Sequence, residues 1–75
     1  MLIRLAELEQ AINYWRKRTP SEGEELRLSA EVASLAEPYA LMIVSGKREM
    51  DDAQFSAAAR SALQLWRIAQ RDQNG

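Results

Sequence analysis

Apolar residues recur every three or four positions along the first part of the chain, and polar residues fill the positions between them. The apolar set consists of Leu5, Leu8, Ala11, Ile12 and Trp15. Such spacing places one apolar stripe on a helix with about 3.6 residues per turn. Because Pro20 disfavours helical angles at Thr19, the pattern predicts a helix over about 5–18. Met1 to Ile3 either continue this helix or pack as an extended arm.

A second apolar stripe predicts a helix over about 29–46. It consists of Val32, Leu35, Ala36, Tyr39, Met42 and Ile43. Ser29 is a suitable N-cap, and Gly46 is a natural stop because glycine readily adopts the left-handed conformation that ends many helices. Pro38 lies inside the pattern, where a proline loses a backbone hydrogen bond and costs roughly 3 kcal/mol. Since the apolar phase continues across Pro38, a kinked but continuous helix is favoured over a break there.

A third stripe predicts a helix over about 51–71, followed by a polar tail at 72–75 that is expected to fray. The stripe consists of Phe55, Ala59, Ala62, Leu65, Trp66 and Ala69. Asp51 with Gln54 three residues later has the spacing that is typical of a helix N-terminus. Three amphipathic helices of this length predict an all-α fold, a small three-helix bundle.

The length of the chain and the residue types that it lacks narrow the range of functions. The 75 residues predict a single helical domain over 1–75. The chain contains no cysteine and no histidine. Their absence removes thiolate metal sites, the commonest metal ligand and the commonest general base. We therefore expect no metal, no cofactor and no enzymatic activity.

The charge balance counts against a dedicated nucleic-acid domain without excluding a local basic patch. Ten basic and eleven acidic residues give a net charge of −1, whereas nucleic-acid-binding domains are usually clearly basic. The start of the chain lacks the long apolar core of a signal peptide, and the most apolar window, YALMIV, is far too short to span a bilayer. We expect a soluble cytoplasmic protein without membrane contact.

The end of the first predicted helix carries a dense group of aromatic and cationic residues. The candidate binding residues in it are Asn13, Tyr14, Arg16 and Arg18. Cations complement the dipole at a helix C-terminus, and acidic residues over 22–25 can pair with them, so a structural role covers most of the group. Asn13 is less well explained, because asparagine is a poor interior helix residue. Asn13 and Arg16 share a flank, where they either hold a ligand or tie down the backbone of 19–25, and the second is favoured.

The third predicted helix carries a row of polar residues on the side away from its apolar stripe. The row consists of Arg60, Gln64, Arg67 and Arg71, and a helical projection places its three arginines within roughly 40° of each other. The helix dipole accounts for Arg67 and Arg71 but not for Arg60, in mid-helix. A solvated face is the simpler interpretation. The functional interpretation is an anion-binding stripe for nucleic acid or for an acidic protein surface.

Three apolar residues lie off the core stripes and form a candidate interface. They are Leu41, Val44 and Ile68. Scattered exposed apolar residues are normal, but a cluster of them in space marks an interaction surface. In so small a domain, self-association enlarges the core, which makes homo-oligomerisation an obvious use of such residues.

Three runs of the sequence resemble a known family. The runs LEQAINYWRKRTPS, EVASLAEPYALMIV and AARSALQLWR resemble a small bacterial family of uncharacterised helical domains, with a signature close to A-I-N-Y-W-R-x-R-x-P-S. The resemblance covers about Leu5 to Arg67 and implies a short helical protein with no assigned activity. Pro38 departs from the pattern, since a better helix former is expected there. The motif implies that six residues act as one unit: Asn13, Tyr14, Arg16, Arg18, Pro20 and Ser21.

These features favour a non-enzymatic protein-binding or self-assembly module of unknown biochemical role. A protein partner or a second copy of the chain is expected more than a nucleic acid. The alternative is a nucleic-acid-binding module that uses the third-helix arginines and the first-helix cations. That alternative is disfavoured because the connection between the second and third predicted helices is longer than the turn of a helix-turn-helix motif.

Overall fold

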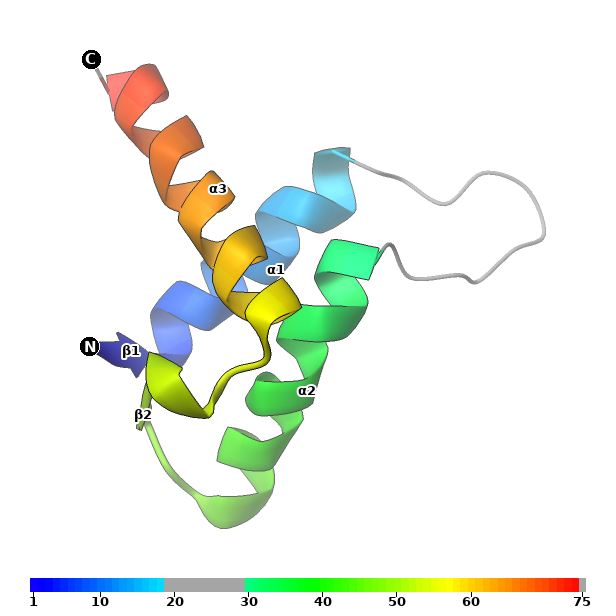
Figure 1. Cartoon of the computed structure of the whole chain (residues 1–75), viewed down its shortest axis with the longest axis vertical. Helices are drawn as coiled ribbons and strands as arrows, with labels where there is room; N and C mark the ends of the chain where they lie inside the picture. Colours follow the sequence, from blue (N-terminus) through cyan, green and yellow to red (C-terminus); the bar gives the residue numbers. More distant parts are fainter. Residues whose placement is uncertain (19–29, 75) are drawn as a thin grey trace, which may run out of the picture.

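The computed structural model describes residues 1–18 and 30–74 and shows three helices around one hydrophobic core (Figure 1). In chain order the elements are β1 (Leu2–Arg4), α1 (Leu5–Arg18), α2 (Ala30–Ser45), β2 (Glu49–Asp51), the short 3₁₀ helix η1 (Asp52–Gln54) and α3 (Ala57–Asn74). The predicted all-α three-helix bundle is confirmed. The predicted connection between the first two helices and the cap at Ser29 lie outside the described residues.

Helix α1 has the bounds that the sequence pattern predicts. Leu8, Ala11 and Trp15 are buried along its apolar stripe. The indole N–H of Trp15 donates to the backbone carbonyl of Ala62 in α3, with an N–O distance of 3.1 Å. This bond satisfies the one polar atom of the ring, so Trp15 fills core volume without leaving a buried donor unpaired.

The residues before α1 form the extended arm rather than another helical turn. β1 pairs antiparallel with β2, and Ile3 lies opposite Met50 in the register. Both of these residues are buried, while Leu2, Arg4 and Glu49 are exposed. The sequence pattern does not predict β2, whose single buried residue gives no alternation to detect. The two short strands close one end of the core with the pair Ile3 and Met50.

Helix α2 is one continuous α-helix that passes through Pro38. The expectation of a continuous helix is therefore confirmed, and the alternative of a break is wrong. Pro38 itself is buried, so its ring packs in the interior while its missing N–H leaves the carbonyl of Ser34 without the usual helical donor.

Gly46 ends α2 as the sequence predicts. Its φ of +69° lies in the left-handed region that favours glycine. The N–H of Lys47 donates to the carbonyl of Met42 at 2.9 Å, and the N–H of Gly46 donates to the carbonyl of Ile43 at 3.2 Å. This pair of bonds is the Schellman motif, which satisfies carbonyls that the helix end would otherwise leave open.

Helix α3 begins at Ala57, later than the sequence predicts. The Asp51 carboxylate does accept a hydrogen bond, from the N–H of Ala53 at 2.9 Å, but it caps η1 rather than α3. The N-cap of α3 is Ser56, whose hydroxyl accepts from the N–H of Ala59 at 3.1 Å. The predicted start at 51 is wrong because a strand residue and a 3₁₀ turn intervene before the chain enters α3.

Replacing Ser56 by alanine is expected to lower the free energy of unfolding by about 1 kcal/mol, because the N–H of Ala59 loses its acceptor. The matched control is Ser61→Ala on the same helix. Ser61 is exposed, and alanine is a better helix former there, so the control should leave stability equal or slightly higher. Urea unfolding of the two variants measures the difference, and equal stabilities would contradict the cap assignment.

The core face of α3 differs from the predicted stripe, because Leu63 takes the place of Leu65 and Ala69 is only partly buried. Leu63, which the stripe omits, is only 3% exposed, whereas the predicted core residue Leu65 is 49% exposed. The buried face consists of Ala59, Ala62, Leu63 and Trp66, which is the i, i+3, i+4, i+7 pattern of a helix. Ile43 of α2 is a similar error, because Met42 takes the core position and leaves Ile43 52% exposed.

The C-terminal bound of α3 also differs from the prediction. The helix continues to Asn74, through most of the tail that the sequence predicts to fray. Figure 1 shows α3 crossing α1 and extending beyond the other helices toward the C-terminus. The core contacts of α3 therefore lie in its N-terminal part, where the last buried residue is Trp66.

A candidate protein-binding groove

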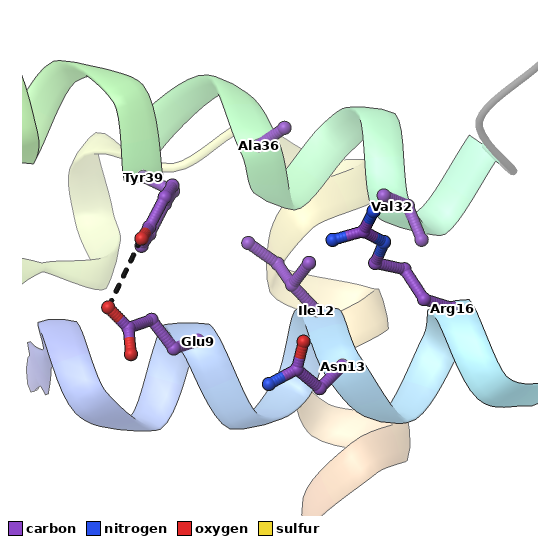
Figure 2. Close-up of a pocket in the computed structure, with 7 residues that line it drawn as sticks. All are labelled: Glu9, Ile12, Asn13, Arg16, Val32, Ala36 and Tyr39. Carbon is purple, nitrogen blue, oxygen red and sulfur yellow. Dashed lines mark hydrogen bonds between the residues drawn. The ribbon is translucent and has the colours of Figure 1, made fainter. Parts of the chain in front are cut away.

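A groove of about 430 Å³ lies between α1 and α2 (Figure 2). It is lined by Glu9, Ile12, Asn13 and Arg16 from α1 and by Val32, Ala36 and Tyr39 from α2. The volume falls within the range of about 300–1,000 Å³ that is usual for ligand pockets. The α1 residues share the groove because positions separated by three, four and seven residues lie on one side of a helix.

The middle of the groove is apolar. Ile12 of α1 and Ala36 of α2 lie there, both partly buried, and Ile12 packs against the core cluster. The apolar pattern assigns these residues to the core stripes and does not indicate their second role at the edge of the core. The sequence of α1 does contain a signal for the groove, because Glu9 and Arg16 lie seven residues apart and therefore on the same side of the helix as Ile12 and Asn13.

One end of the groove is closed by Tyr39 and Glu9. The Tyr39 hydroxyl donates to Oε1 of Glu9 with an O–O distance of 3.1 Å (Figure 2). This hydrogen bond, together with partial desolvation and the charge of Glu9, raises the pKa of the Tyr39 phenol above its ordinary value of 10.0. Tyr39 therefore stays protonated and holds the carboxylate in place. Oε2 of Glu9 remains available to a donor from outside the groove.

The other end of the groove carries Arg16, while Asn13 lies near the middle, beside Ile12 on α1 (Figure 2). Both side chains are exposed, and neither has a hydrogen bond or an ion pair with the residues that the structure describes. Figure 2 shows the guanidinium of Arg16 reaching toward α2 near Val32. The predicted tie between Asn13 and the backbone of 19–25 involves residues outside the described part of the chain and stays a prediction.

The structure places Tyr14 and Arg18 away from the groove. The Tyr14 ring meets the Trp15 ring edge to face, with centroids 5.2 Å apart and an interplanar angle of 81°. The Arg18 guanidinium carbon lies 5.9 Å from the centroid of the Tyr14 ring, near the limit of about 6 Å for a cation–π contact. Tyr14 lines a second hollow, between α1 and α3, that also includes Asn13 and Trp66. Asn13 thus belongs to two hollows.

The four members of the polar row on α3 differ in their contacts and exposure. Arg67 donates from Nη2 to Oε2 of Glu7 in α1 at 2.9 Å, and the two side chains are 26% and 34% exposed. Its Nη1 lies 3.2 Å from the sulfur of Met1. Arg67 therefore ties α3 to α1 and to Met1, the residue before β1. The other three members of the row, Arg60, Gln64 and Arg71, are exposed.

The three candidate interface residues do not gather into one patch. Leu41, Val44 and Ile68 are all exposed, and Val44 is 87% exposed. Figure 1 shows the last turns of α2, which carry Leu41 and Val44, at the bottom of the molecule, while the second half of α3 rises at the top. Ile68 lies on that second half, so it cannot join the other two in a single copy of the chain.

Metal-binding clusters and membrane-spanning helices are both absent from the described part of the chain. Within residues 1–18 and 30–74 there is no group of three or more histidine, cysteine, aspartate or glutamate side chains that could hold a metal ion. No helix in that same part of the chain combines the length and the apolar character needed to cross a membrane.

Comparison with known proteins places the chain in a family. Neither the curated proteins nor the solved structures contain a match to it. A family model described as "Protein of unknown function (DUF3717)" matches residues 1–68. The matched region includes every residue that lines the groove between α1 and α2. Because the match spans nearly the whole chain, the protein belongs to the DUF3717 family, whose members are described as proteins of unknown function.

Proposed function

We propose that the chain is a non-enzymatic protein-interaction module and that the groove between α1 and α2 is its contact surface. One observation carries this proposal. Asn13 and Arg16 are exposed and have no partner among the described residues, and Arg16 stands at the end of a groove whose middle holds the apolar side chains of Ile12 and Ala36. A guanidinium held beside an apolar hollow is the kind of group that protein interfaces use as an anchor.

The two ends of the groove give it a direction. Arg16 offers several N–H donors in a planar fork that matches a carboxylate, while Glu9 presents its second carboxylate oxygen at the Tyr39 end. Opposite charges at the two ends orient a partner, and the apolar middle supplies contact area. An amphipathic helix laid along such a groove, with its apolar face inward, is a common mode of protein recognition.

Replacing Arg16 by glutamate is expected to weaken partner binding by about tenfold or more, because the anchor is lost and a like charge faces the partner's carboxylate. The matched control is Arg60→Glu on α3, which makes the same change of charge at an exposed position away from the groove. Tagged wild-type and variant proteins are compared by quantitative capture from the native cell. Equal recovery of partners by the wild type and Arg16→Glu would contradict the proposal.

Nucleic-acid binding through α3 is the second candidate, because Arg60, Gln64 and Arg71 are exposed on one helix. It has less support, since Arg67 in the middle of that row is engaged by Glu7. The same pair of variants separates the two functions. Nucleic-acid binding predicts that Arg60→Glu is the damaging change and that binding falls steeply with added salt.

A further inference from the structure

The groove face of α1 is complementary to itself. Glu9 and Arg16 lie seven residues apart, so they project from α1 within about 20° of each other and about 10 Å apart along the axis. Their midpoint falls between Ile12 and Asn13, which also line the groove. A two-fold axis through this midpoint and perpendicular to α1 exchanges the position of Glu9 with that of Arg16.

We propose that this face of α1 binds the same face of a second copy of the chain, with the two α1 helices antiparallel. The inference rests on the proposed function and names the occupant of the groove. Each Arg16 then meets Glu9 of the other copy, and the two ion pairs are related by symmetry. Such isologous contacts generate closed two-fold dimers, the commonest form of soluble oligomer.

The remaining groove residues fit this arrangement. Ile12 lies next to the two-fold axis and meets Ile12 of the second copy, which removes an apolar side chain from water. Asn13 lies on the other side of the axis, and its side-chain amide carries both donors and an acceptor, so it pairs with the same group of the second copy. This pairing explains why an asparagine, a poor helix former, occupies the exposed face of α1.

The details of charge also fit a second copy. Tyr39 occupies Oε1 of Glu9 and leaves Oε2 for the incoming guanidinium. Arg16 has no intramolecular ion pair among the described residues, so it gives up no existing partner there when the copies meet. Ala36 lies in the middle of the groove, and its small side chain allows close approach. The same surface therefore supplies both the cation and the anion of each ion pair between the two copies.

Charge exchange at the two ends tests the pairing. Glu9→Arg alone produces repulsion at both ends of the dimer, because a cation then faces Arg16 of the other copy, and Arg16→Glu alone does the same with two anions. Each variant is expected to weaken self-association by about tenfold or more. An equimolar mixture of the two variants brings opposite charges together at both ends, so a mixed dimer should form. Arg60→Glu is the control and should dimerise as the wild type does.

Sedimentation velocity measures the association, and native mass spectrometry identifies the mixed dimer. Circular dichroism of each variant confirms that it is folded. A wild type that stays monomeric at the highest soluble concentration overturns the inference, and so does a mixture that fails to form a mixed dimer from folded variants. If the wild type is monomeric but Arg16→Glu loses the partners that the wild type captures, the proposed function stands and only the self-pairing is wrong. If the wild type is monomeric and Arg16→Glu captures the same partners, both the proposed function and the self-pairing are wrong.

A cysteine placed near the two-fold axis gives an independent measurement. The natural chain has no cysteine, so Asn13→Cys introduces a single thiol. Oxidation of this variant should link two copies through one disulfide, with the electrons passing to an added oxidant such as oxidised glutathione. The control Arg60→Cys, whose thiol lies on α3 away from the contact, should stay largely unlinked at the same concentration. Equal linking of both variants would overturn the antiparallel pairing.

Discussion

Replacing Leu63 by alanine is expected to lower the free energy of unfolding by about 2–5 kcal/mol, which is the usual cost of truncating a buried leucine. Leu63 is only 3% exposed and belongs to the core cluster of the three helices. The total stability of a chain of this length is about 4–11 kcal/mol. A single truncation at this position therefore removes a large part of it and leaves a protein that is measurably unfolded at moderate urea concentrations.

Leu65→Ala is the matched control for this prediction. The two leucines lie two residues apart on α3, but Leu65 is 49% exposed. Its truncation gives up only part of a burial free energy, so the expected loss is about 1 kcal/mol or less. Urea unfolding followed by circular dichroism measures both variants under one condition. A larger loss at Leu65 than at Leu63 would show that the buried face of α3 is the predicted stripe and not the one in the structure.

The sequence predicts the three helices because their apolar stripes repeat at the helical period. It also predicts the end of α2 at Gly46, where the residue type fits the backbone geometry. It fails where tertiary contacts decide between local alternatives. Asp51 carries a correct capping signal, yet the strand pairing of Ile3 with Met50 holds the chain extended up to that residue, so the signal caps η1 instead of α3.

Less of the candidate site follows from the sequence. Asn13 and Arg16 are predicted correctly as neighbours on one flank, because both positions belong to one helix. Their relation to Ala36 and Tyr39 depends on how α1 and α2 pack, which periodicity does not specify. Arg67 shows the same limit, since its ion pair with Glu7 joins residues 60 positions apart in the chain. A row of arginines on one helix does not show which of them will form an ion pair with a carboxylate on another helix.

Replacing Pro38 by alanine is expected to stabilise the protein by about 1–2 kcal/mol. Proline in a helix interior is about 3 kcal/mol less favourable than alanine, because it removes a hydrogen bond and crowds the preceding turn. Pro38 lies in the interior of the continuous helix α2. The opposing effect is the loss of about two buried methylene groups, at roughly 0.8 kcal/mol each. The restored hydrogen bond to the carbonyl of Ser34 outweighs that loss, and the urea midpoint should rise.

Pro38→Val separates the backbone effect from the packing effect. Valine restores the N–H as alanine does and keeps nearly the volume of the ring, at a helix-propensity cost of about 0.6 kcal/mol relative to alanine. If the missing hydrogen bond dominates, both variants are more stable than the wild type. If packing of the ring dominates, Pro38→Ala is destabilising while Pro38→Val recovers stability. Destabilisation by both variants would contradict the prediction, because it would mean that the packing of α2 against α1 and α3 requires the backbone shape that proline imposes.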